Sequence, residues 1–567
     1  MVHVQISSLS MSPAPGERLL RHVGDRVRFA LKHEDGTDFP SGWRVLLRTN
    51  IGRAIAARQE VIAHRGGGSP FAGTSWRDIP MRPDGADWAL DLPLTEIGWF
   101  RAKAYAVDEH GKQRWPAGSD IGISVLPDAY RTGNTIYCAF TRSFGGARTA
   151  ASTANPLLEA QLVALDAHGY TAIPPSGKLR DLTAQLPHIV DTLGCRILHL
   201  LPITPTPTTY ARFGRYGSPY AGQDLTQIDP ALVEFDRRTT GVDQFRELAY
   251  AAHLKGARVF LDIVINHTGW GSRLQETKPD WFRRDADGAF HSPGAWGNTW
   301  EDLVELDHAK PELWEELADA FLVWCRRGVD GFRCDAGYMV PSAAWQYITA
   351  KVRLEFPDTM FLLEGLGGAW EITECLLTEG NLQWAYSELF QNYDGAQVGS
   401  YLDHVIRTAG RIGPLIHYSE THDNDRLAKR GRDWSLLRNR LCALTSISGG
   451  FGFTCGVEWL AREKINVHQN KGLNWGAADQ IVDELGDLNR LLLDHPCFFD
   501  GAVLERLSAD DAPLYALRRT AADGGDSLLV LANLDLSQAH AFVLPAASDD
   551  ALGKPRLDLV GGAMVAV

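Results

Sequence analysis

The stretch "VDGFRCDAGYMV", residues 329–340, begins as an apolar run and then places Arg333 and Asp335 two positions apart. Side chains two positions apart in a β-strand point to the same face of the sheet. Two opposite charges therefore share one face at the end of what the pattern predicts to be a buried strand. Buried charges are costly unless they are paired or used, so this strand end is the first candidate for a functional position.

Seven further strand-like runs surround this one and alternate with amphipathic stretches such as "VDQFRELAYAAHLKG" and "PELWEELADAFLVWCRRG". Repeated alternation of strand and helix patterns is typical of a parallel sheet closed by crossover helices. The sequence therefore predicts an α/β fold, a (β/α)8 TIM barrel within residues 129–499. The eight predicted strands lie within residues 135–140, 196–203, 258–266, 329–335, 360–366, 384–390, 415–423 and 450–459.

The segments on either side of the barrel have different patterns. Residues 1–128 carry short runs with β-branched or aromatic residues between turn sequences, which predicts an all-β, Ig-like N-terminal β-sandwich. Residues 268–305 are too long for a simple barrel loop and are expected to form a protruding subdomain. Residues 500–567 return to strand patterns and predict a small C-terminal β domain, whose abrupt end in "GGAMVAV" leaves open a truncated domain.

Composition narrows the classes of protein. The net charge of −14 comes without a basic stripe, which argues against nucleic acid as a partner. No apolar run approaches the roughly 20 residues of a membrane span, and the first residues lack the pattern of a signal peptide. The eight cysteines form no CxxC pair and read as buried free thiols, so a cytoplasmic protein is expected. The oligomeric state stays open.

Polar residues collect where four of the predicted strands end. A single carboxylate at such a place usually caps the next helix, and a single histidine is usually structural. Four strand ends that converge on one rim of a barrel are harder to explain by capping, because that rim is where barrel enzymes hold their active sites. The residues are Asp262, Asn266 and His267 on the third strand, Arg333 and Asp335 on the fourth, Glu364 on the fifth, and His422 and Asp423 on the seventh.

This set of side chains suits the cleavage of glycosidic bonds with retention of configuration. That chemistry needs a carboxylate nucleophile and a carboxylic acid that protonates the leaving oxygen. Asp335 beside Arg333 is expected to stay ionised. Glu364 follows an apolar strand, and apolar surroundings favour the protonated form that a proton donor needs. Asp423 is expected to stabilise the cationic transition state.

Four short stretches, "FLDIVINH", "GFRCD", "LLEG" and "THDN", resemble the ordered signature regions of the α-amylase family, glycoside hydrolase family 13. The resemblance covers residues 130–500. It implies Asp335 as nucleophile, Glu364 as acid/base and Asp423 as transition-state stabiliser. It also implies that the first sugar is bound by Arg333, His267, His422, Asp262 and, through the segment "YAGQDLTQIDP", by Tyr220, for which the alternative is a packed turn aromatic.

The sequence also departs from that family. Many α-amylases carry a Lys-His pair shortly after the nucleophile, whereas this chain has Ala336, Gly337 and Tyr338. The acceptor side therefore differs, which puts simple endo-hydrolysis in doubt. Asn266 matches a calcium ligand of many relatives, so a structural calcium is conceivable, although no cofactor is required for the chemistry.

The predicted function is that of a retaining enzyme acting on α-glucan or malto-oligosaccharides, by hydrolysis or by glucosyl transfer. Amylase, glucanotransferase and debranching enzyme stay open as alternatives within the class. The alternative from another class is a non-catalytic α-glucan-binding or scaffold protein on the same fold. A phosphate-binding barrel such as an isomerase is disfavoured, because no glycine-rich phosphate loop follows the last two strands.

Overall fold

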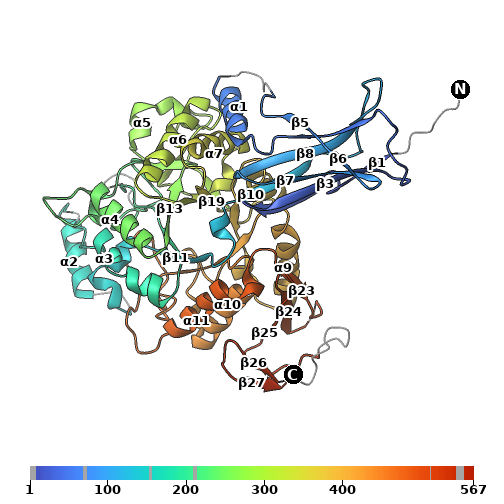
Figure 1. The fold of residues 1–567 in the computed structure, drawn as a ribbon. Coiled ribbons are helices and arrows are strands. Elements are labelled where there is room, and N and C mark those ends of the chain that lie inside the picture. Colours follow the sequence, from blue (N-terminus) through green and yellow to red (C-terminus); the bar gives the residue numbers. More distant parts are fainter. Residues whose placement is uncertain are drawn as a thin grey trace.

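The computed structural model describes residues 8–67, 73–151, 156–170, 172–207, 213–510, 512–543 and 555–566. Figure 1 shows a pair of N-terminal sheets that extend to one side of a barrel, with two small C-terminal sheets below it. The largest apolar cluster fills the barrel and the layer between its strands and helices. A second cluster lies between the N-terminal sheets.

The N-terminal segment folds into two sheets around a common apolar core. Alternation along the strands decides which residues face that core, as in β3, where Val27, Phe29 and Leu31 are buried between more exposed neighbours. The first sheet has the order β1 (Leu9–Ser12), β3 (Arg26–His33), β7 (Asp87–Pro93), β6 (Arg82–Asp84). The second has the order β2 (Arg18–His22), β10 (Ile121–Leu126), β8 (Gly98–Val107), β4 (Arg44–Thr49), β5 (Arg77–Pro80), with β9 (Gln113–Arg114) on β8.

A helix interrupts this segment, so the prediction that residues 1–128 are all β is wrong there. Helix α1 (Ala54–Gly67) lies between β4 and β5 and packs on helix α7 (Ser342–Glu355) of the barrel. Its alanine-rich sequence favours a helix over a strand. Arg58 extends from it and donates to the carbonyl oxygens of Arg353 and Ile97, both at 2.8 Å. The helix therefore fastens the N-terminal sheets to the outside of the barrel.

Eight parallel strands close into the predicted barrel, and each lies within one of the eight predicted runs. Each strand pairs with the next in chain order, and the last pairs with the first. The TIM-barrel prediction is therefore confirmed. The strands are β11 (Thr135–Ala139), β12 (Ile197–Leu200), β13 (Arg258–Val264), β18 (Gly331–Asp335), β19 (Met360–Leu363), β20 (Trp384–Tyr386), β21 (Leu415–Tyr418) and β22 (Phe451–Thr454).

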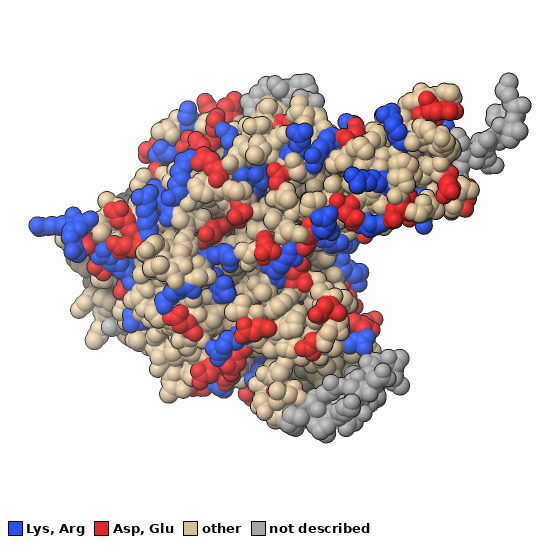
Figure 2. Space-filling view, in the orientation of Figure 1, with Lys and Arg blue, Asp and Glu red and all other residues tan. Residues whose placement is uncertain are grey.

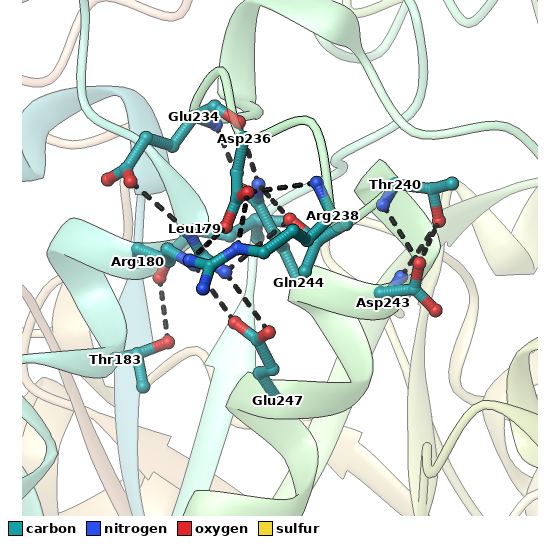
Figure 3. Close-up of polar contacts among 11 residues, drawn as sticks. Leu179, Arg180, Thr183, Glu234, Asp236, Arg238, Thr240, Asp243, Gln244 and Glu247 are labelled. Atoms are coloured by element: carbon teal, nitrogen blue, oxygen red, sulfur yellow. Dashed lines mark hydrogen bonds and ion pairs between the residues drawn. The ribbon is translucent and has the colours of Figure 1, made fainter.

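Helices surround the barrel (Figure 1). Most of them bury an apolar face, whereas helix α2 (Pro156–Ala167) buries only Leu162. The guanidinium of Arg180 joins two of them to the intervening loop, through Glu247 of α4 at 3.0 Å and through Glu234 and Asp236 at 3.2 and 3.1 Å (Figure 3). The helices are α2 (Pro156–Ala167), α3 (Leu179–Thr183), α4 (Gly241–Leu254), α6 (Pro311–Arg326), α7, α8 (Trp370–Leu377), α9 (Gly395–Ala409), α10 (Arg432–Leu444) and α11 (Val482–Asp494).

Residues 268–305, predicted to protrude, hold short elements of their own. Strand β14 (His267–Gly269) pairs with β17 (Leu303–Glu305), which brings both ends of the excursion back to the barrel. Between them lie helix α5 (Arg273–Thr277) and the hairpin of β15 (Gly294–Ala295) and β16 (Asn298–Thr299).

The C-terminal segment forms one antiparallel sheet of β23 (Val503–Arg506), β24 (Leu514–Thr520) and β25 (Ser527–Asn533), and a separate pair of β26 (Pro555–Leu557) and β27 (Met564–Ala566). The runs "LYALRRTA" and "DSLLVLANLD", predicted to be strands, form β24 and β25. The run "HAFVLP" forms no strand over residues 540–543, and residues 544–545 lie outside the described part. Arg506 contacts Asp403 of α9 at 3.0 Å and so ties the sheet to the barrel.

Positive and negative side chains are interspersed over the face shown in Figure 2. No helix in the described part of the chain is long and apolar enough to cross a lipid bilayer. All eight cysteines are free, and seven of them are buried.

Candidate active site

The register of the parallel strands brings the polar strand ends together. Asp262 of β13 pairs with Arg333 of β18, and Asp335 is the last residue of β18. Glu364 follows β19 directly, and its backbone amide donates to the carbonyl oxygen of Cys334 at 3.1 Å. The three carboxylates thus come from three neighbouring strands at their carboxyl ends, the rim where barrels place reacting groups.

The guanidinium of Arg333 is the centre of this cluster and is almost fully buried. Its Nη1 lies 2.6 Å from Oδ1 of Asp335 and 3.1 Å from both carboxylate oxygens of Asp262. Its Nη2 lies 2.9 Å from Oε2 of Glu364. Glu364 Oε2 also accepts a hydrogen bond from the backbone amide of Ala336 at 2.7 Å. One cation therefore orients three carboxylates, with planar geometry suited to contacting several oxygens at once.

Three carboxylates around one guanidinium leave an excess of negative charge when all are ionised. Burial raises the pKa of Asp335 well above its usual range; Arg333 opposes this, and Glu364 and Asp262 add to it. Burial also acts to raise the pKa of Asp262, but Arg333, which contacts both of its oxygens, holds that pKa below the usual value. Asp262 therefore stays ionised, whereas Asp335, whose pKa is raised, takes up a proton readily.

Tyr220 and His422 form the neighbouring wall of the site. The Tyr220 hydroxyl donates to Oδ2 of Asp262 at 2.9 Å and lies 2.8 Å from Nε2 of His422. The two rings are stacked, with centroids 5.4 Å apart and planes 10° from parallel. Arg333 lies over the Tyr220 ring at 5.8 Å. The alternative that Tyr220 is only a packed turn aromatic does not account for these polar contacts.

His267 approaches the cluster from the opposite side. Its Nε2 lies 3.7 Å from Oδ2 of Asp335, and this buried nitrogen has no hydrogen-bond partner among the described residues. Burial lowers the pKa of His267 to about 3, so the ring is neutral at ordinary pH. Trp300 packs beside it with ring centroids 5.9 Å apart. A neutral imidazole with one unused nitrogen is suited to a ligand hydroxyl group.

Residues 126–362 match the family model described as alpha amylase, catalytic domain. The match covers the first four strands of the barrel, most of the fifth, and the strand ends that carry Asp262, Arg333 and Asp335. The resemblance read from the four short stretches is therefore confirmed for this part of the chain.

Several curated relatives of this chain carry the name alpha-1,4-glucan:maltose-1-phosphate maltosyltransferase. The protein from Cereibacter sphaeroides is 26% identical over 398 residues, which are 65% of this chain and 64% of the relative. The protein from Pseudomonas aeruginosa is 27% identical over 401 residues, 65% and 58% of the two chains. The Burkholderia pseudomallei protein is 26% identical over 94% of this chain but 53% of its own length. The chain thus spans between about half and just under two thirds of these relatives.

Solved structures confirm the fold. An α-amylase from Lactobacillus plantarum superposes with a TM-score of 0.59 at 24% identity, covering 77% of this chain and 95% of that one. An Anoxybacillus α-amylase gives the same TM-score at 20% identity, with 77% and 94% covered.

Three features of the site differ from the sequence-based expectations. Asp335 is expected to stay ionised beside Arg333, but burial, with added repulsion from Glu364 and Asp262, raises its pKa well above the usual range. Asp423 is not part of the charged cluster: its side chain is 63% exposed and contacts Nε2 of His422 at 3.1 Å. It stands on the rim, one residue beyond the buried His422. Glu364 does not sit in apolar surroundings, because the end of its strand turns it toward Arg333 and the amide of Ala336.

Sequence reasoning missed further residues of the α-amylase-type barrel. His199 of β12 is fully buried, and its Nε2 lies 3.8 Å from Oδ2 of Asp262 while Nδ1 lies 3.2 Å from the hydroxyl of Tyr418. Tyr386 of β20 lies under Arg333, with 5.4 Å between its ring centroid and the guanidinium. The available signal was their position: each is a polar residue in or at the end of an apolar barrel strand.

The contacts of Asn266 do not fit a calcium ion. Its side-chain nitrogen faces Nδ1 of His267 at 3.3 Å and the sulfur of Met339 at 3.9 Å, and its backbone carbonyl accepts from Leu306 at 3.0 Å. Calcium prefers six to eight oxygen ligands, and the one group of three His, Cys, Asp or Glu with metal-ligand spacing among the described residues does not include a neighbour of Asn266. Calcium therefore stays a prediction.

The group that has the spacing of metal ligands lies elsewhere in the molecule. Ligand atoms of His22, Asp25 and Asp500 lie within 4.8 Å of one another, where the N-terminal sheets meet the C-terminal segment. The guanidinium of Arg131 already contacts Asp25 at 2.7 Å and Asp500 at 3.1 Å. The Arg131 guanidinium already supplies the positive charge that a metal ion would bring, so this group connects the N-terminal sheets to the C-terminal segment.

Proposed function

We propose that this chain is a retaining α-glucan-active enzyme that transfers a glycosyl unit through a covalent intermediate on Asp335. One observation carries the proposal: a single guanidinium contacts Asp335 at 2.6 Å and Glu364 at 2.9 Å. Two carboxylates held by one group are close neighbours, as a retaining mechanism requires of its nucleophile and its acid. The raised pKa of Asp335 supports the presence of one proton within the cluster, which the mechanism needs for protonation of the leaving oxygen.

In the first step, a carboxylate oxygen of Asp335 bonds to the anomeric carbon from the side opposite the leaving group. Glu364 gives its proton to the leaving oxygen as that bond breaks. The raised pKa of Asp335 places the proton of the cluster on that residue in the free protein, so this proton must pass to the leaving-group side before Asp335 can attack as the anion. Arg333, which contacts both Asp335 and Glu364, then offsets the negative charge of the attacking carboxylate. Asp262 remains ionised and holds Arg333 and Tyr220 in place.

In the second step, Glu364 takes the proton from an incoming hydroxyl, whose oxygen displaces Asp335 from the anomeric carbon. The product keeps the α configuration after two inversions. The unused nitrogen of His267, the ring of Tyr220 and the exposed carboxylate of Asp423 are positioned to contact the sugar hydroxyls. Asp423 would close on the sugar from the rim and favour the cationic transition state.

The nature of donor and acceptor follows from two further observations. The relatives are named as transferring maltosyl from maltose 1-phosphate to α-1,4-glucan. The positions after the nucleophile are Ala336, Gly337 and Tyr338, which differ from the Lys-His pair of many α-amylases. Both favour transfer over hydrolysis, with a maltosyl donor and an α-glucan acceptor. The eight free cysteines suit a reducing compartment and support a cytoplasmic location.

The test is product analysis on maltose 1-phosphate supplied with maltoheptaose, glycogen or a branched limit dextrin. We expect phosphate release that depends on the acceptor, lengthened glucan chains, and a new linkage in the α configuration by proton NMR. Short products from the glucans alone would show a hydrolase. No turnover on any of them, with glucan binding retained, would support the scaffold alternative. A β-configured first product would refute the mechanism.

A further inference from the structure

The hairpin of β15 and β16 turns through Trp296 and Gly297, both with left-handed backbone, φ +51° and +79°. Two consecutive positive φ angles define a tight hairpin turn that prefers Asn-Gly or Gly-Gly. A bulky residue in this conformation is strained, and such strain persists mainly at functional positions. Trp296 is therefore an outlier that needs an explanation.

Packing does not supply that explanation, because Trp296 is 71% exposed. The part of the indole that is covered lies against Gly367. A Cβ atom at Gly367 would come within 2.7 Å of the indole Nε1 and 3.0 Å of Cζ2, so only glycine allows the ring to lie here. Gly367 itself has φ +71°. Strained backbone on both partners thus holds a large aromatic face open to solvent.

The position of the ring relative to the reacting groups is the third observation. Gly367 is three residues after Glu364, in the loop that leaves β19, and its amide donates to Oε1 of Glu388 at 2.7 Å. Next to it, Gly368 faces Tyr338. Tyr338 is three residues after Asp335 in the chain, and burial raises its pKa to about 12, with added repulsion from Glu364 and Asp335.

These contacts place Trp296 against the loop that follows Glu364, the proposed proton donor. In a retaining mechanism Glu364 faces the leaving group, and the acceptor enters along the same path in the second step. Trp300, four residues later, lies instead beside His267 on the Asp335 side. The two tryptophans of this segment therefore lie next to different parts of the rim: Trp300 beside His267, and Trp296 against the loop that follows Glu364.

We propose that Trp296 is the platform on which a sugar ring of the α-glucan acceptor stacks, an assignment that rests on the proposed transfer reaction. The apolar face of a pyranose ring can stack on an exposed indole without breaking a hydrogen bond of the protein. Tryptophan offers a large contact area and loses little side-chain entropy on binding. The glucan chain would run from the opening above Asp335 and Glu364 over the loop of Gly367 and onto the hairpin.

The main test compares the wild type with Trp296→Gly, using α-maltosyl fluoride as donor and maltoheptaose as acceptor. Glycine suits the left-handed turn, so the thermal midpoint of the variant should equal or exceed that of the wild type. We expect the half-saturating maltoheptaose concentration to rise about tenfold and the ratio of transfer to hydrolysis to fall by a similar factor. Trp296→Phe keeps an aromatic face and should recover most of the acceptor use.

A matched control is Trp115→Gly, which removes a partly exposed tryptophan that stacks on Tyr105 in the N-terminal sheets, with ring centroids 4.1 Å apart. It should leave acceptor use unchanged. Unchanged acceptor dependence in Trp296→Gly would overturn the assignment while fluoride release by the wild type upholds the proposed function.

Binding of maltoheptaose to Asp335→Asn protein, with and without Trp296→Gly, gives a second readout that needs no catalysis. Calorimetry should show weaker binding when Trp296 is absent. Equal binding would contradict the platform, whatever the outcome of the rate measurements.

Discussion

Arg333 and Asp335 lie two residues apart on one strand, and their side chains meet at 2.6 Å on the same face of β18. The same guanidinium also contacts Asp262 and Glu364. Arg333 therefore pairs with three carboxylates and not with Asp335 alone. Removing its guanidinium would leave these three buried carboxylates without a cation.

Arg333→Leu should lower kcat/KM by at least about 100-fold, the usual scale for losing an electrostatic group at a reacting centre. It should also destabilise the fold by about 3–5 kcal/mol at pH 8, since a broken buried ion pair leaves uncompensated charge. Without the cation, the folded-state pKa of Asp335 rises further. The contribution of Asp335 to stability is then fully present only below the pKa of this residue in the unfolded chain. It is lost as the pH rises through the folded-state pKa.

The measurement is the thermal midpoint from pH 4.5 to 8, where the deficit of Arg333→Leu should grow with pH. Arg438→Leu is the matched control, because this buried guanidinium contacts carbonyl oxygens, those of Asn392 at 2.8 Å and Leu389 at 2.6 Å. Its deficit should not change with pH. A deficit of Arg333→Leu that is equally constant would show that the carboxylates do not depend on the arginine.

Asp335→Asn should abolish turnover, because an amide is a poor nucleophile, and it should also stabilise the protein. Burial raises the folded-state pKa of Asp335 well above its unfolded value. The wild type therefore loses stability as pH rises through that folded pKa, by about 1.4 kcal/mol for each unit of difference. Asparagine cannot ionise, so the midpoint of the variant should exceed that of the wild type by about 2 °C or more at pH 8 and converge with it near pH 4. A variant less stable than the wild type at pH 8 would contradict the argument.

The barrel could be predicted because its signal is repeated eight times, and the rim because parallel strands bring their carboxyl ends together. Arg333 and Asp335 needed only the two-residue period of a strand. The contact of Arg333 with Asp262 and Glu364 required knowledge of which strands are neighbours and of their register, which a barrel topology supplies only once it is known.

Other features had no sequence signal of that kind. The place of helix α1 depends on its packing against α7, where Arg58 contacts Arg353, 295 positions later in the chain. The exposure of Asp423 depends on the rotamer and loop path beyond His422. Trp296 reads as one tryptophan among 17, and only its φ angle and the approach of Gly367 distinguish it. Long-range packing and local backbone strain are properties of the folded chain.

Tyr220→Phe tests the wall of the site. The change removes the hydroxyl that lies 2.9 Å from Asp262 and 2.8 Å from His422 but keeps the ring stacked on His422. We expect kcat to fall about 10- to 100-fold, in line with the roughly 1.5–3 kcal/mol of a hydrogen bond to a charged group, with little change in KM. Tyr137→Phe removes a buried hydroxyl that donates to Glu458 at 2.7 Å and should cost stability but not rate. Equal losses of rate in both variants would point to a general effect of packing.

His267→Gln separates the two roles that a histidine beside a nucleophile can have. Burial lowers the pKa of His267 to about 3, so the ring is neutral from about pH 4 upward and cannot produce a limb of the pH–rate profile in that range. Glutamine keeps a neutral donor, so we expect the rate to fall about tenfold while both limbs of the profile stay in place.

The folded-state pKa of His267 lies below the unfolded value of about 6.5. Stability from this group is therefore present above pH 6.5 and is lost as pH falls toward 3, and His267→Gln should lose less stability than the wild type between pH 7 and pH 4. His110→Gln, on an exposed side chain, should change neither property. A limb that moves or vanishes in His267→Gln would show instead that the imidazole titrates during catalysis.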